Sequence, residues 1–200
     1  MSAGLVPPSE VDRETLPRKR FTRQDVDRLT EAGVFEGQRY ELIDGDLIDK
    51  KGQKPPHAIS IQLLVDAFVA LLGASLVRVQ LPMEASGKDR ERSLPEPDFA
   101  ILKDRKPEFH QRHPRGDELL LVVEVSDTTA RFDLSRKAEL YAAAGVPEYW
   151  VLDLQRRMLI VHRQSDGAIY RLQQLLSERD TVTIEGRSES LRVADILPQA

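Results

Sequence analysis

The sequence predicts an α/β (α+β) fold in which helices flank a central mixed β-sheet. Residues 119–125 read Leu-Leu-Leu-Val-Val-Glu-Val, a nearly continuous apolar run that is typical of a central strand covered on both faces. Residues 134–144 carry apolar side chains at helical spacing, and several shorter extended segments lie around them. The chain has 200 residues, of which 40% are hydrophobic, and this is enough for one domain with a full core.

The first elements follow from local signals. Residues 1–20 show no apolar periodicity and end in a basic run at 18–20, which predicts a flexible N-terminal arm that is more typical of a solvated tail than of a binding segment. Thr22, with Asp25 three residues later, predicts the capped start of a helix. Asp44-Gly45 lies between two extended runs over 39–48 and predicts a β-hairpin.

A longer helix is expected after Pro55-Pro56, and Gly73 is expected to end it. Its apolar positions at roughly helical spacing are Ile59, Leu63, Phe68, Leu71 and Leu72.

The second half predicts alternating strands and one further helix. Asp133 is the expected N-cap of the helix over 134–144, which Gly145-Val146-Pro147 should end. Strands are expected at 76–83, 97–102, 119–125, 149–154 and 158–162, with edge strands at 169–172 and 181–184.

Composition narrows the functional classes. The chain has no cysteine, which excludes disulfides, thiolate metal sites and cysteine nucleophiles. We see no apolar run of about 18 residues and no signal-peptide core at the N-terminus, so we expect a cytoplasmic protein without a membrane partner. The net charge of −4 means that nucleic-acid binding would depend on local basic patches.

Glu124 is the first candidate for chemistry, because it interrupts the most apolar strand. Burial of an unpaired carboxylate costs several kcal/mol, so a cation, a proton or solvent must reach it. A metal ligand at the mouth of a site and a strand-end glutamate paired to a surface arginine both satisfy this condition.

Two other candidates lie on neighbouring elements. Asp98 begins a strand after Pro95-Glu96-Pro97, although such sequences also occur in turns. Lys137 shares the inner stripe of the predicted helix with Leu134, Ala138, Tyr141 and Ala144. It could bridge to Glu124, act on a substrate phosphate, or extend its ammonium group into water.

Glu41 and the histidines are weaker candidates. Strand alternation places Glu41 on the same face as Ile43, which suggests an inward carboxylate, while an edge-strand charge is the alternative. His57 is interpreted as a helix-start residue near the mouth of the site. His110 and His113 have no acidic ligand pattern beside them, which makes a zinc site improbable.

Four segments carry a resemblance to a known family. They are Arg-Tyr-Glu-Leu-Ile-Asp-Gly (39–45), Pro-Glu-Pro-Asp (95–98), Val-Val-Glu-Val-Ser (122–126) and RKAELYAAAGVPEYWVLD (136–153). Together they resemble the Uma-two family of restriction endonuclease-like proteins, a branch of the PD-(D/E)XK nuclease superfamily, over roughly residues 21 to 165. The resemblance implies a single restriction-endonuclease-like domain over 21–200.

The resemblance also implies an active site. Asp98 corresponds to the Pro-Asp acid, Glu124 to the acid of the next motif, and Glu41 to the acid of the first hairpin. The superfamily usually places a lysine two residues after the second acid, where this chain has Ser126. The family's alternative, a lysine on the following helix, corresponds to Lys137.

By the same resemblance, a divalent Mg²⁺ or Mn²⁺ ion would be held by Asp98, Glu124 and the Val125 carbonyl, with Glu41 completing the shell directly or through water. The leading hypothesis is a metal-dependent endonuclease that hydrolyses DNA phosphodiester bonds. A cleavage-inactive nucleic-acid-binding or protein-interaction module on the same fold is the alternative. The possibility of a homodimer is left open.

Overall fold

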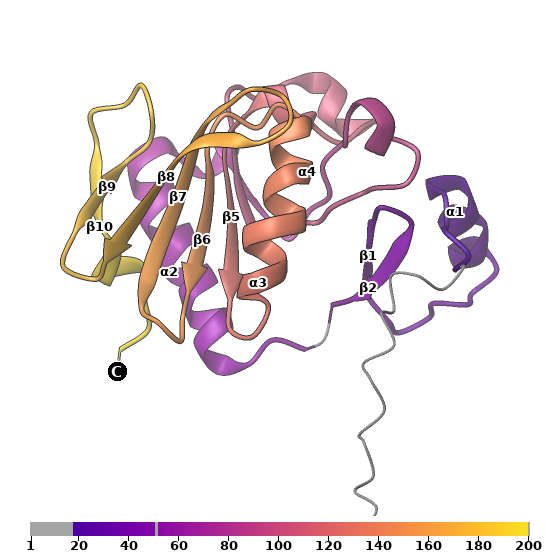
Figure 1. Ribbon diagram of the computed structural model, residues 1–200, viewed down its shortest axis with the longest axis horizontal. Coiled ribbons are helices and arrows are strands. Elements are labelled where there is room, and N and C mark those ends of the chain that lie inside the picture. Colours follow the sequence, from indigo (N-terminus) through magenta and orange to yellow (C-terminus); the bar gives the residue numbers. More distant parts are fainter. Residues whose placement is uncertain (1–17, 51, 200) are drawn as a thin grey trace, which may run out of the picture.

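A computed structural model describes residues 18–50 and 52–199 of the protein (Figure 1). Most of the predicted N-terminal arm therefore lies outside the described residues. At its described end, the Arg20 guanidinium pairs with Asp46 and also donates to the Asp44 carbonyl.

The centre of the molecule is a mixed six-stranded sheet in the order β3-β4-β5-β6-β7-β8. β5 and β6 run parallel, and the other neighbouring pairs are antiparallel. This confirms the predicted fold class. The strands are β3 (Val77–Val79), β4 (Phe99–Leu102), β5 (Leu119–Ser126), β6 (Tyr149–Asp153), β7 (Met158–Ser165) and β8 (Tyr170–Ser177).

Helices cover both faces of this sheet (Figure 1). On one face, α2 (Pro55–Leu72) packs Leu64 and Phe68 against alternate residues of β4, β5 and β6. On the other face, α3 (Ala130–Phe132), a π-helical turn (Asp133–Lys137) and α4 (Ala138–Ala143) form one continuous helical segment. Tyr141 is fully buried there against the side chains of the second face.

The remaining elements surround this three-layer centre. They are α1 (Arg23–Glu31), the hairpin β1 (Tyr40–Ile43) and β2 (Asp46–Asp49), and the C-terminal pair β9 (Thr181–Thr183) and β10 (Ser190–Arg192). The described residues also contain five short 3₁₀ helices, at Ala74–Leu76, Gly87–Asp89, Pro107–His110, Gly116–Glu118 and Val193–Ile196. In Figure 1 the hairpin and α1 lie on the side of the molecule opposite β9 and β10.

Two local signals near the N-terminus are confirmed. Thr22 and Asp25 form the reciprocal capping box of α1. Asp44 and Gly45 both have positive φ, at 49° and 78°, which is the turn geometry that an Asp-Gly pair favours in a tight hairpin.

The helix predicted over 134–144 begins four residues earlier, so Asp133 is not its N-cap. Thr129 precedes the helix and Asp133 lies inside it, as the first residue of the π turn. The wider turn changes the angular position of the residues that follow. Lys137, Ala138 and Tyr141 are buried as expected, whereas Leu134 is only partly covered.

The inner face of α2 differs from the predicted stripe. Ser60, Ile61, Leu64 and Phe68 are buried, whereas Ile59 and Leu71 are exposed. By length and composition α2 could also span a membrane, with a mean hydropathy of 1.5 over 18 residues, so our expectation that no such run exists was wrong. This is weak evidence for a membrane, because a core helix can pass the same test.

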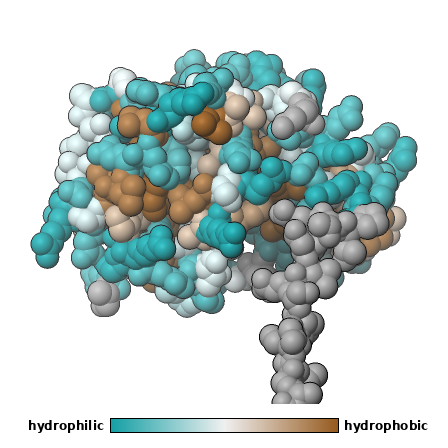
Figure 2. Space-filling view, in the orientation of Figure 1, coloured by the Kyte–Doolittle hydropathy of each residue, from teal (hydrophilic) through white to brown (hydrophobic). Residues whose placement is uncertain are grey.

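The strands also depart from prediction at their ends. β3 has only three residues, because the chain leaves the sheet at Gln80 with a positive φ. β8 is longer than predicted and forms one edge of the sheet, with Leu172 and Leu175 exposed. Figure 2 shows apolar surface on this side of the molecule amid a largely hydrophilic exterior. β9 does not extend the main sheet, since it pairs with β10, which the sequence did not predict.

Candidate active site

Asp98 and Glu124 meet because β4 and β5 are antiparallel neighbours. Phe99 pairs with Val123 and Ala100 with Val122, so the residue before β4 lies beside Glu124. Strand alternation directs both acids to the face of the sheet that α4 covers. Asp98 is 5% exposed and Glu124 only 2%, so each acid must find its partners within the protein.

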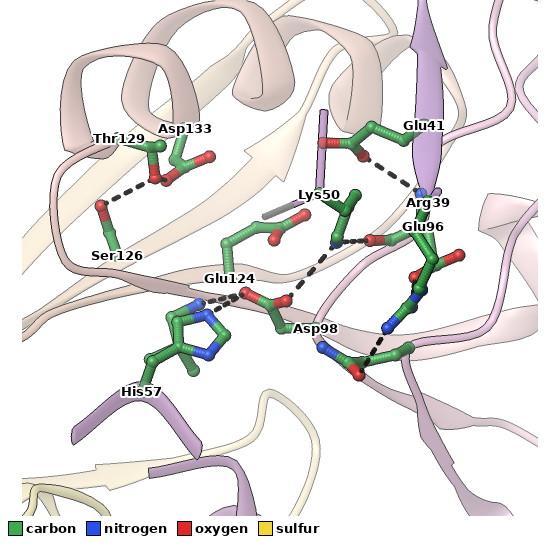
Figure 3. Close-up of polar contacts among 12 residues, drawn as sticks. Arg39, Glu41, Lys50, His57, Glu96, Asp98, Glu124, Ser126, Thr129 and Asp133 are labelled. Carbon is green, nitrogen blue, oxygen red and sulfur yellow. Dashed lines mark hydrogen bonds and ion pairs between the residues drawn. The ribbon is translucent and has the colours of Figure 1, made fainter. Parts of the chain in front are cut away.

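The two oxygens of Asp98 have different neighbours (Figure 3). Oδ2 accepts a hydrogen bond from the Val125 amide at 3.0 Å and lies 3.1 Å from His57 Nε2. Oδ1 lies 3.5 Å from Lys50 Nζ, which also donates to the Glu96 carbonyl at 2.7 Å. Asp98 is therefore held by one strand, by the first turn of α2 and by the end of the hairpin.

Glu124 is bound from the opposite side by the helix. Lys137 Nζ donates to Oε1 at 2.9 Å, and the Tyr141 hydroxyl donates to the same oxygen at 2.6 Å. Since both donors contact Oε1, Oε2 is the oxygen that remains for another partner. The i, i+4 spacing of Lys137 and Tyr141 places both groups on one helix face.

Glu41 enters the site from β1 and completes the surroundings of Lys137. Its Oε1 lies 2.8 Å from Lys137 Nζ, and its Oε2 accepts from the Glu96 amide at 3.3 Å. Lys137 therefore bridges two carboxylates, and only 4% of its side chain is exposed. The alternative in which Lys137 extends into water is excluded by this burial, as is the pairing of Glu124 with a surface arginine.

A second group of hydrogen-bonded polar side chains lies next to the acids, at the start of the helix. The Ser126 and Thr129 hydroxyls are 3.3 Å apart, and Thr129 donates to Asp133 Oδ2 at 2.6 Å. Ser126, which takes the position of the usual superfamily lysine, thus connects the strand end to the helix start. The π turn that begins at Asp133 ends at Lys137, and such turns are frequent at functional sites.

The electrostatics of the two acids differ. Burial raises the pKa of Glu124 to about 8, opposed by Lys137 and reinforced by the Asp98 carboxylate. Burial acts in the same direction on Asp98, but His57 and Lys50 outweigh it and hold the pKa of Asp98 well below its ordinary value. The surroundings of Asp98 therefore favour its ionised form, whereas burial opposes the charge on Glu124.

All of these acids line one large cavity with a volume of about 880 Å³. Asp98, Glu124, Val125, Glu41 and Lys137 contribute to its wall, as do Lys50, His57, Asp127 and Asp133. The cavity lies between the hairpin, the N-terminal end of α2 and the start of α3. It is large enough to admit part of an extended ligand.

The donor set suits a hard divalent cation. The Asp98 and Glu124 carboxylates would supply oxygen ligands, and the Lys50 and Lys137 ammonium groups lie against these acids and balance their charge. Among residues 18–50 and 52–199, no group of three or more histidine, aspartate or glutamate side chains is arranged to hold a metal ion. A cation here would therefore depend on water for much of its shell, as Mg²⁺ commonly does.

The structure brings together every side chain predicted for the site. It adds Lys50 and Tyr141, and it places His57 directly against Asp98. Tyr141 had a sequence signal, because it shares the helical stripe with Lys137. Lys50 had none, since a lysine after a hairpin strand is typical of a solvated surface. Whether Glu41 ligates a metal, directly or through water, stays a prediction.

The sequence matches a family model described as "Putative restriction endonuclease", named Uma2, over residues 23–194. No curated protein matches the sequence. A solved structure from Anabaena variabilis, described as "a putative nuclease belonging to DUF820", superposes with a TM-score of 0.61 at 13% identity. The match covers 78% of this chain and 88% of the other.

Fold and family together define the class of protein as restriction endonuclease-like. The chain belongs to the Uma2 family, as its four matching segments indicated.

Proposed function

We propose that this protein is a metal-dependent endonuclease that hydrolyses DNA phosphodiester bonds, using Mg²⁺ or Mn²⁺. The observation that carries the proposal is the pairing of Asp98 and Glu124 on adjacent strands, at the wall of one large cavity. Membership in the Uma2 family supports the same chemistry. We also propose a cytoplasmic location, where DNA and Mg²⁺ are available.

Asp98 and Glu124, with the Val125 carbonyl, would hold the divalent cation. When bound, the cation would polarise the scissile phosphate and lower the pKa of a coordinated water. Asp98 is prepared for this role, because His57 and the Val125 amide orient its Oδ2 and favour its ionised form.

Lys137 and Tyr141 would position Glu124. Their donors fix Oε1 and leave Oε2 for the cation. Glu41 in turn holds Lys137 in place through a 2.8 Å ion pair. Because Lys137 is bound to two carboxylates, its effect on the reaction would be electrostatic, through the charge it places beside the site.

The test is cleavage of supercoiled plasmid and labelled duplex DNA with Mg²⁺, with Mn²⁺ and with EDTA. The parent protein should cleave only with metal. Asp98→Asn and Glu124→Gln should each reduce the rate by about 10² or more, since each removes a carboxylate that would hold the cation at the reacting centre. Asp66→Asn is the matched control, because Asp66 is exposed on α2 and bonded to Gln62.

Cleavage in EDTA, or full activity in Asp98→Asn, would contradict the proposal. One observation favours the alternative of a cleavage-inactive nucleic-acid-binding module. Ser126 replaces the usual lysine, and Lys137 is fully engaged by Glu41 and Glu124. That alternative predicts metal-dependent DNA binding without cleavage by the parent protein.

A further inference from the structure

Lys50 is a second ammonium group at the site, and nothing in the sequence pattern marked it. It follows β2, and its amide donates to the Arg39 carbonyl at 2.9 Å, so its backbone is fixed to the hairpin. Its Nζ reaches the Glu96 carbonyl at 2.7 Å and lies 3.5 Å from Asp98 Oδ1 (Figure 3). A lysine ammonium has three donors, and these two contacts among the described residues occupy at most two of them.

The position of Lys50 on Asp98 is specific. Oδ2 is already occupied by the Val125 amide and by His57, and Oδ1 is the oxygen that Lys50 faces. A divalent cation that binds Asp98 would use this same oxygen. Lys50 and the cation therefore compete for one site.

The two lysines of the site differ in how firmly they are held. Lys137 lies 2.8 Å and 2.9 Å from two carboxylates, and its side chain is 4% exposed. Lys50 is 14% exposed, and among the described residues it forms an ion pair with Asp98 alone, at the longer distance of 3.5 Å. Of the two, Lys50 is the one that can leave its carboxylate without stranding a second one.

We infer that Lys50 is the displaceable counter-ion of Asp98: it neutralises Oδ1 in the metal-free protein, gives way to a divalent cation, and then presents its ammonium group to a phosphate of bound DNA. The inference rests on the proposed nuclease function and names a substrate-contacting residue for it. Because the Lys50 backbone stays fixed to the hairpin, the ammonium group remains in the cavity when the side chain moves.

The substitution Lys50→Met tests both parts of the inference, because it should strengthen the binding of the cation and weaken the binding of DNA. Mn²⁺ binding, measured by calorimetry without DNA, should become about tenfold tighter, because the substitution removes a positive charge that competes for Asp98. A tenfold change in affinity corresponds to about 1.4 kcal/mol of binding free energy. Affinity for a labelled DNA duplex, measured by anisotropy with Ca²⁺ and checked by gel for intact DNA, should fall about tenfold. The slope of log affinity against log salt should decrease by about one, as expected for one lost phosphate contact.

Two further variants serve as controls. Lys103→Met removes the same charge from a lysine that also donates to a backbone carbonyl at 2.7 Å, but it lies beyond the other end of β4. It should leave Mn²⁺ affinity and the salt slope unchanged. Lys50→Arg retains the positive charge, so it should keep DNA affinity close to the parent value and should not tighten Mn²⁺ binding.

Unchanged or weaker Mn²⁺ binding by Lys50→Met would overturn the inference, since Lys50 would then only support Asp98. An unchanged DNA affinity and salt slope would overturn it as well. In either case metal-dependent cleavage by the parent would leave the proposed nuclease function intact. If the parent binds Mn²⁺ but neither binds nor cleaves DNA, the nuclease function and this inference both fail.

Discussion

At the scale of single residues, Lys137 has the most demanding position. Its ammonium group is buried between Glu41 and Glu124, with a hydroxyl of Tyr141 on the second acid. Burial opposes its charge, but Glu124 and Glu41 raise the pKa of Lys137 above its ordinary value. The lysine is thus a structural cation in the metal-free protein as well as an electrostatic element of the site.

Lys137→Met should therefore destabilise the metal-free protein by about 3–5 kcal/mol, because it strands buried carboxylates. Urea unfolding in EDTA measures this loss. The double substitution Lys137→Met with Glu41→Gln should recover part of the stability, since it removes one of the stranded charges. If Lys137→Met unfolds within about 1 kcal/mol of the parent, the ion pairs contribute little and the site is more hydrated than its burial indicates.

Glu124 should make stability depend on pH. Its pKa is about 8 in the folded protein and 4.5 as its ordinary value, so the folded state binds more protons between these two values. The free energy of unfolding should then decrease as pH rises from about 5 to 8. Each unit of pKa difference corresponds to about 1.4 kcal/mol, so the effect should exceed about 1 kcal/mol.

Glu124→Gln cannot release this proton, and its stability should vary less over the same pH range. Urea unfolding of both proteins at pH 5, 6.5 and 8 in EDTA gives the comparison. Parallel curves for the parent and Glu124→Gln would show that Glu124 is ionised in the folded protein across this range.

At the scale of elements, the hairpin β1–β2 adds two charged groups to the two acids that the main sheet positions. It supplies Glu41 from β1 and Lys50 from the position directly after β2, although it shares no strand pairing with the six-stranded sheet. Leu42 and Leu94 form the isolated bridge that connects it to the rest of the protein. The turn at Gly45 adds a bond from its amide to the Arg92 carbonyl at 2.7 Å.

Gly45→Ala should therefore disturb the hairpin and the site together. Gly45 has a φ of 78°, and an added Cβ would lie 2.8 Å from the Cβ of Arg20. Gly167→Ala is a matched control, because Gly167 has a φ of 87° and no atom within 4 Å of an added Cβ. Gly167→Ala should cost about 1 kcal/mol from backbone strain, and Gly45→Ala distinctly more.

Thermal melts of both variants measure this difference in stability. Calorimetry with Mn²⁺ shows whether Gly45→Ala also changes the affinity of the acids for the cation. Equal loss of stability in the two variants would mean that Arg20 moves away freely and that the hairpin tip is not tightly packed.

At the scale of the whole molecule, the site is a junction of separate layers. The sheet contributes Asp98 and Glu124, α2 contributes His57, the helical segment after β5 contributes Lys137, and the hairpin contributes the remaining charges. A cation that binds at this junction would stabilise all of these contacts in the folded state and none in the unfolded chain.

Mn²⁺ should accordingly raise the melting temperature of the parent protein relative to EDTA. At a hundredfold excess over its dissociation constant a ligand adds about 2.7 kcal/mol, which corresponds to a shift of about 5 °C or more for a protein of this size. Asp98→Asn should lose the shift, and Asp66→Asn should retain it. A parent protein that melts at the same temperature with and without Mn²⁺ would show that the acids form only an ion-pair network.

The sequence by itself determined the parts of this protein that depend on neighbouring residues. The apolar run of β5 marked a strand covered on both faces, Asp44-Gly45 defined the hairpin, and Pro55 and Gly73 bounded α2. The same local reasoning identified Glu124, because a carboxylate within such a strand is too costly to bury without a partner.

Only the tertiary structure decided which groups meet. The antiparallel register of β4 and β5 places Asp98 beside Glu124, and the π turn orients Lys137. The docked hairpin brings Lys50 to Asp98 across 48 positions of sequence. Contacts between such distant positions depend on how whole elements pack, and no local propensity or periodicity records that packing.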